Sequence, residues 1–109
     1  MNAEYYDLNV WGSDSNILYL TAYEWELAPD GEIQMNTEKY WTTYFKGLDD
    51  LAEIEFLLGD LYVNNYPLTD YDEWRDLDSL YNENTPKKIR KFLEGLPMYN
   101  VPIVGAIDG

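Results

Sequence analysis

Residues 16–27, NILYLTAYEWEL, decide the fold class of this chain because apolar and aromatic side chains alternate along them with a period of two. Successive side chains of a β-strand point to opposite faces, so this alternation predicts a strand. One face would carry Ile17, Tyr19, Thr21, Tyr23, Trp25 and Leu27. The other would begin with Leu18, Leu20 and Ala22 and end with Glu24 and Glu26. We therefore expect a strand covered on both sides at its start and solvated at its end.

The segments on either side of residues 16–27 also predict strands. Tyr5–Trp11 is rich in β-forming residues and is separated from this strand by the turn-like sequence Gly12-Ser13-Asp14-Ser15. Pro29-Asp30-Gly31 predicts a hairpin, because glycine adopts the positive φ that such loops need. Two further strands are expected at Glu32–Asn36 and Tyr40–Phe45. Together these segments predict an antiparallel sheet of three to four strands.

After Gly47 the apolar spacing changes to three and four residues, which is typical of amphipathic helices. The first helix is expected over residues 48–61, with Leu48, Leu51, Ile54, Leu58 and Leu61 on its apolar side. A second is expected over Tyr71–Tyr81 with Thr69 as its N-cap, and a third begins with Thr85 as N-cap and Pro86 at its first position. The tail Val101–Ile107 is a candidate C-terminal edge strand.

These elements predict an α+β fold in one domain, residues 1–109, because strands come first and helices follow. Residues 1–46 are expected to be mainly strands, 47–97 mainly helices, and 98–109 an apolar tail.

The charge of the chain is strongly unbalanced, with 21 acidic residues against seven basic ones and a net charge of −14. Four of the seven cations lie in Lys87-Lys88-Ile89-Arg90-Lys91, where we expect them to pair with nearby acidic helices. Such a charge repels nucleic acid and anionic lipid and attracts basic surfaces. The sequence has no cysteine, no signal-like start and no long apolar run, which favours a cytoplasmic protein without membrane contact.

Several kinds of chemistry are not expected. The chain lacks histidine and cysteine, so it can form neither a Ser-His-Asp triad nor a zinc-thiolate site. Its glycines do not form a nucleotide-binding pattern. The acidic run from Asp70 to Asp78 has Arg75 and Tyr81 where a calcium loop starting at Asp70 needs glycine and glutamate. We therefore predict no catalytic residues, no cofactor and no metal ligand, although a carboxylate-pair enzyme stays an alternative.

Eleven acidic residues fall between positions 49 and 83, opposed only by Arg75. On a helix, Asp72, Glu73 and Asp76 would be neighbours. Tyr66, in an expected loop, would be the exposed aromatic, whereas Trp74 is expected in the core. The predicted partner-binding residues are Asp49, Asp50, Glu53, Asp60, Tyr66, Asp70, Asp72, Glu73, Asp76 and Asp78.

Nucleic-acid-binding grooves are lined with lysine and arginine, so a protein that displays carboxylates at comparable spacing can occupy one. The hypothesis is an inhibitor that mimics nucleic acid and blocks the groove of a nuclease or of a restriction or CRISPR-type complex. A phage-encoded anti-CRISPR or anti-restriction protein is the natural setting, and an immunity protein for a basic nuclease toxin is a related alternative. A non-inhibitory structural or accessory module, bound through the apolar tail, is the other.

Overall fold

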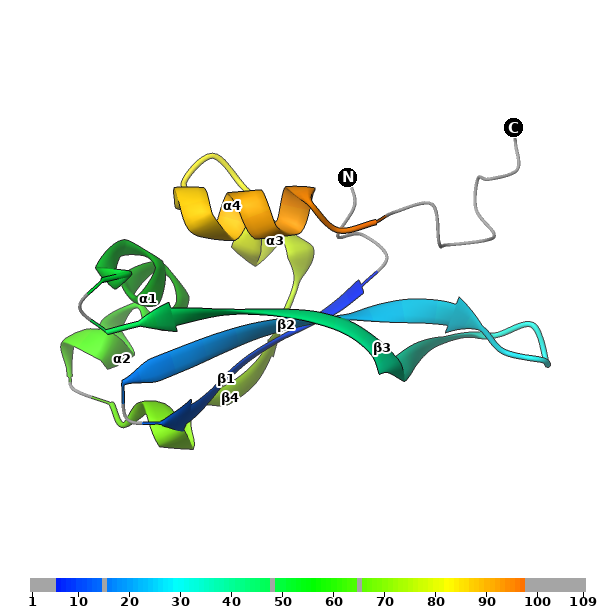
Figure 1. Ribbon diagram of the computed structural model, residues 1–109, viewed down its shortest axis with the longest axis horizontal. Coiled ribbons are helices and arrows are strands. Elements are labelled where there is room, and N and C mark those ends of the chain that lie inside the picture. Colours follow the sequence, from blue (N-terminus) through cyan, green and yellow to red (C-terminus); the bar gives the residue numbers. More distant parts are fainter. Residues whose placement is uncertain (1–5, 15, 48, 65, 98–109) are drawn as a thin grey trace.

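The computed structural model describes residues 6–14, 16–47, 49–64 and 66–97 and shows an α+β fold (Figure 1). Three long strands come first: β1 (Tyr6–Asp14), β2 (Ile17–Leu27) and β3 (Ile33–Lys46). They are followed by α1 (Leu51–Leu58), α2 (Asp60–Val63), the 3-10 helix η2 (Leu68–Asp70), β4 (Asp72–Arg75), α3 (Leu77–Leu80) and α4 (Lys87–Glu94). The predicted fold class is confirmed. The candidate strand at Val101–Ile107 lies outside the described residues.

The sheet has four antiparallel strands in the order β3-β2-β1-β4. The two strands expected at Glu32–Asn36 and Tyr40–Phe45 are one continuous strand, β3, with an irregularity in its pairing to β2 between Tyr23 and Trp25. Figure 1 shows the β2–β3 hairpin extending away from the helices. The irregularity lets one long strand keep its pairing while it bends.

The prediction of a helix over Tyr71–Tyr81 is wrong. Residues 72–75 form β4, which pairs with β1 from Leu8↔Arg75 to Trp11↔Asp72. Only the four-residue helix α3 follows it. The outer edge of β1 offers unpaired backbone groups to this segment. Pairing with that edge overrides the local helical spacing of Tyr71, Trp74 and Leu77.

Two other helix boundaries differ from the prediction. The first helix stops at Gly59, whose φ of 57° is left-handed, and α2 continues after it. Thr85 does not cap α4: its hydroxyl accepts a hydrogen bond from the Asn82 amide at 2.7 Å and donates one to the Leu80 carbonyl oxygen at 2.9 Å. The hydroxyl therefore closes the loop before α4 instead of beginning the helix.

One hydrophobic core lies between the sheet and the helices. The fully buried apolar side chains are mainly aliphatic and come from the even-numbered positions of β1 and β2, from Phe45 of β3 and from the helices: Leu8, Val10, Leu18, Leu20, Phe45, Ile54, Leu57, Leu80, Ile89 and Leu93. Leu51 and Leu61, which were expected to face inward, are exposed. In the described part of the chain, no helix is long and apolar enough to cross a membrane.

Candidate functional site

The ten predicted partner-binding residues are spread over α1, α2, η2, β4, α3 and the segments between them. They do not form one helical face, because β4 interrupts the helices. Their side chains fall into two groups. The side chains of one group make contacts within the chain, and those of the other group are exposed without such contacts.

Asp50 belongs to the engaged group. Its Oδ2 atom accepts a hydrogen bond from the Lys46 amide at 2.9 Å and lies 3.2 Å from the Lys88 ammonium nitrogen. Burial alone would raise the pKa of Asp50, but the Lys46 amide and the Lys88 charge outweigh it, and the pKa is lowered. This carboxylate ties the start of α1 to α4.

Glu53 is buried and serves the same junction. Its Oε2 atom accepts a hydrogen bond from the backbone amide of Lys88 at 3.3 Å. That amide belongs to the first turn of α4, where backbone N–H groups lack helical partners and negative charge is favoured. Glu53 thus takes the capping role that the sequence had suggested for Thr85.

Asp72 and Glu73 point to opposite faces of β4, so the expected neighbourhood of Asp72, Glu73 and Asp76 on a helix is wrong. Asp72 accepts a hydrogen bond from the Asn9 amide group at 2.9 Å. Glu73 accepts one from the Tyr71 hydroxyl at 3.2 Å and lies 3.8 Å from the Arg75 guanidinium. Glu73 is therefore already partly neutralised within the fold.

Tyr71 is held between these same groups. Its hydroxyl accepts a hydrogen bond from the Arg75 guanidinium at 2.8 Å. Burial raises the pKa of Tyr71, and the Glu73 charge adds to this effect, while Arg75 opposes it. The hydroxyl therefore stays protonated as part of the packing between β4 and α1.

The remaining five carboxylates are exposed and belong to Asp49, Asp60, Asp70, Asp76 and Asp78. Glu55 and Glu83 are exposed in the same stretch of chain. We call the set Asp49, Asp60, Asp70, Asp76 and Asp78 the free acidic set. Among the described residues, none of these five side chains takes part in an ion pair or a side-chain hydrogen bond. Their charge is thus directed to the solvent.

The expectations for the aromatic residues are reversed. Tyr66 is half-buried: its ring meets the edge of Tyr71 with centroids 6.0 Å apart, and it packs against the core. Trp74, expected in the core, is 55% exposed, and Tyr40 and Tyr44 are 56% and 48% exposed. The alternation of Tyr40 and Tyr44 with Trp41 and Phe45 was the signal that could have identified the two tyrosines as exposed.

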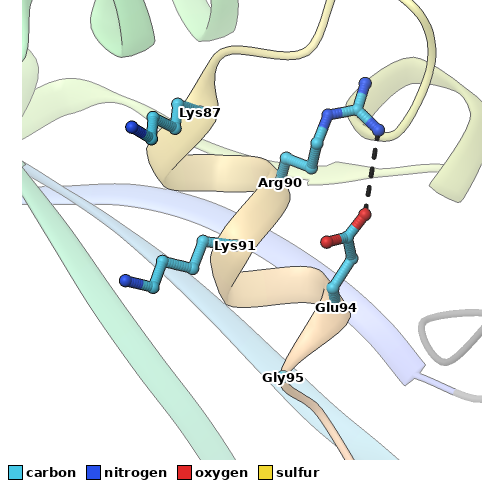
Figure 2. Close-up of a pocket in the computed structure, with 5 residues that line it drawn as sticks. All are labelled: Lys87, Arg90, Lys91, Glu94 and Gly95. Carbon is cyan, nitrogen blue, oxygen red and sulfur yellow. Dashed lines mark ion pairs between the residues drawn. The ribbon is translucent and has the colours of Figure 1, made fainter.

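The basic cluster is only partly neutralised. Lys88 pairs with Asp50, as expected for a cation beside an acidic helix. On α4, Arg90 points toward Glu94, 3.8 Å away, while Lys87 and Lys91 extend from the opposite side of the helix (Figure 2). Lys87, Arg90, Lys91, Glu94 and Gly95 line an open, shallow depression. The guanidinium of Arg90 also lies over the Tyr81 ring, 4.9 Å from its centroid.

No group of three or more acidic side chains among the described residues is arranged to hold a metal ion. The acidic run from Asp70 to Asp78 is divided among η2, β4 and α3.

Comparisons of the chain with protein-family models, with curated proteins and with solved structures find no match.

Proposed function

We propose that this protein is a non-catalytic inhibitor that binds the nucleic-acid-binding groove of a basic protein in the cytoplasm. The class of target is a nuclease or a restriction or CRISPR-type complex. The related alternative is an immunity protein that neutralises a basic nuclease toxin, which would be bound through the same electrostatic attraction. The observation that carries the proposal is the free acidic set, whose carboxylates have no cation beside them in the described chain.

The physical argument rests on the cost of keeping these charges unpaired. A net charge of −14 opposes the compact state, and each unpaired carboxylate adds to this repulsion. A basic groove relieves the repulsion, speeds the encounter and pairs charges on both sides. Nucleic acid offers the same groove a similar field, so the two ligands compete.

The first experiment is capture of cell-extract proteins on the immobilised chain, followed by identification of the retained protein and competition with duplex DNA. We expect a basic nucleic-acid-binding protein that DNA displaces. We also expect its affinity to fall at least tenfold between about 50 mM and about 200 mM salt. Retention of proteins that do not bind nucleic acid, or binding that ignores both DNA and salt, refutes the proposal.

A matched pair of variants tests the surface itself. Asp76→Asn with Asp78→Asn changes the net charge from −14 to −12, and Glu32→Gln with Glu38→Gln makes the same change on the distant β2–β3 hairpin. We expect the Asp76/Asp78 variant to weaken capture by about threefold to tenfold, since exposed charge pairs each contribute about 0.2–1 kcal/mol. Equal weakening by both variants would show that only the total charge matters.

A further inference from the structure

The face of the sheet opposite the core carries six aromatic side chains, drawn from all four strands. We call it the open face and define it by Trp11, Tyr19, Tyr23, Tyr40, Tyr44 and Trp74. The registers place these residues on one side: Trp11 pairs with Tyr19 and Tyr19 with Tyr44, while Tyr23 pairs with Tyr40. None of the six belongs to the hydrophobic core or to the side chains packed against it.

The rings touch one another in two rows. In the first row, Trp11 stacks on Tyr19 with centroids 4.5 Å apart, and Tyr19 lies 6.3 Å from Tyr44. In the second row, Tyr23 lies 5.6 Å from Tyr40 and 5.8 Å from Trp74. These contacts between neighbouring strands hold the rings in place before any ligand arrives.

Two threonines separate the rows and anchor the first one. Thr21 and Thr42 are opposite each other in the register, and their hydroxyl oxygens are 3.1 Å apart. The indole N–H of Trp11 donates a hydrogen bond to the Thr21 hydroxyl at 2.9 Å. The open face is thus a fixed aromatic platform with a small polar strip across its middle.

Three of these rings, Tyr40, Tyr44 and Trp74, are about half exposed, and the other three are half-buried beside them. A contiguous exposed apolar patch on a folded protein is typical of a binding surface. The net charge of the protein distinguishes between the ligands that could bind this face. Aromatic sheets can stack the bases of single-stranded nucleic acid, but a net charge of −14 repels the phosphates. A second copy carries the same charge and is repelled as well. A neutral sugar is not attracted by the negative charge of the protein. A cationic side chain is attracted by that charge and can also make cation–π contacts with the ring faces.

One cation of the chain already lies beside one of these rings, at the edge of the sheet. The ammonium nitrogen of Lys88 lies 5.3 Å from the centroid of the Tyr44 ring and 5.4 Å from that of the buried Phe45 ring, and it pairs with Asp50. The registers place Asp7 and Asp72 on the same side of the sheet as the aromatic rows, at β1 and β4. An arginine is the best match, because its planar guanidinium stacks on aromatic rings and also pairs with carboxylates.

We propose that the open face binds arginine side chains from an extended segment of a basic partner protein. This rests on the proposed function for the class of partner, but it uses a different surface from the free acidic set. The aromatic rows recognise arginine by stacking, and the carboxylates of Asp7 and Asp72 lie at the rim to receive the same charge.

The test uses two eight-residue peptides, one alternating arginine with serine and the other lysine with serine. We expect the arginine peptide to bind the full chain about fivefold more tightly than the lysine peptide, and Trp74→Ala with Tyr40→Ala to remove this preference. Trp74→Phe with Tyr40→Phe retains the rings and should restore most of it. The matched control, Leu51→Ala with Leu61→Ala, removes exposed apolar side chains of α1 and α2 and should leave it unchanged.

Nuclear magnetic resonance gives a second, residue-specific measurement, since the chain has four tryptophans. The arginine peptide should shift the indole N–H signals of Trp11 and Trp74, whereas the signal of Trp41, which packs against the core, should stay in place. The proposal is overturned if the alanine variant keeps the arginine preference. It is also overturned if single-stranded RNA or an oligosaccharide shifts these signals and the peptide does not, or if sedimentation shows a dimer that the alanine variant dissociates.

Failure of this proposal and failure of the proposed function give different results. If only the open face is wrong, the Asp76→Asn, Asp78→Asn variant still weakens capture of the basic protein while the aromatic variants bind normally. If only the mimicry is wrong, the arginine preference persists and DNA does not compete with the captured protein.

Discussion

Replacing Asp50 by asparagine should destabilise the fold by about 1.5 kcal/mol at neutral pH. The carboxylate accepts a hydrogen bond from the Lys46 amide and faces the Lys88 ammonium. A hydrogen bond to a charged group contributes about 1.5–3 kcal/mol, and asparagine retains part of it. The ion pair adds less than about 1 kcal/mol, because the Lys88 side chain is 42% exposed and solvent screens the pair. At roughly 4 °C per kcal/mol, Tm should fall by about 6 °C.

The loss should depend on pH in a defined direction. The pKa of Asp50 is below its ordinary value of 3.8 in the folded protein, so the carboxylate stabilises the fold at any pH above the unfolded-state pKa. This contribution disappears as the pH falls through the folded-state pKa, where the aspartic acid becomes neutral like asparagine. The difference between the two proteins should therefore shrink in acid.

Urea denaturation followed by tryptophan fluorescence at neutral pH and at about pH 3 measures both effects. Asp76→Asn is the matched control, because the exposed Asp76 carboxylate has no ion pair in the described chain, and its replacement should change stability by less than about 0.5 kcal/mol. If Asp50→Asn costs no more than this control at neutral pH, or costs as much in acid, Asp50 does not join α1 to α4 as described.

Two further substitutions test the packing around the site. Gly12→Ala should destabilise by about 2 kcal/mol or more, because a Cβ atom would lie 1.8 Å from the Leu68 carbonyl oxygen and would force η2 away from β1; the midpoint of urea unfolding measures it. Thr85→Val should lower stability by about 2 kcal/mol, since the Asn82 amide and the Leu80 carbonyl both lose their partner, whereas Thr85→Ser should cost less than about 1 kcal/mol. A valine variant as stable as the serine variant in thermal unfolding would contradict this assignment.

Most of the sheet could be predicted from local sequence. The alternation in residues 16–27 predicted β2, but the expectation of a strand covered on both sides at its start and solvated at its end was wrong. Only the side of Leu18 and Leu20 lies against the core, and Glu24, near the end, is buried. Such a pattern is reliable because a strand has a period of two and one of its faces lies against the core. The helix at Lys87–Glu94 was predicted from the proline at its start, although Pro86 lies just before the first helical residue instead of being that residue.

Residues 71–81 could not be predicted in this way. Four residues of β4 are too few to show a period, and the partner that makes them a strand, Leu8–Trp11, is more than sixty positions earlier in the chain. The exposure of Trp74 follows from that pairing, since a strand at the sheet edge sends every second side chain to the open face. Local periodicity contains no information about such a partner.

The sequence by itself determined the acidic excess, the lack of histidine and cysteine chemistry, and the α+β order of strands before helices. It could not show which carboxylates remain unpaired. Asp50 and Glu53 reach Lys88 across 38 and 35 positions of chain, and a charge is neutralised by whatever lies beside it in space. Only the tertiary structure could therefore separate the free acidic set from the acids that hold the fold together, and bring six aromatic rings onto one face.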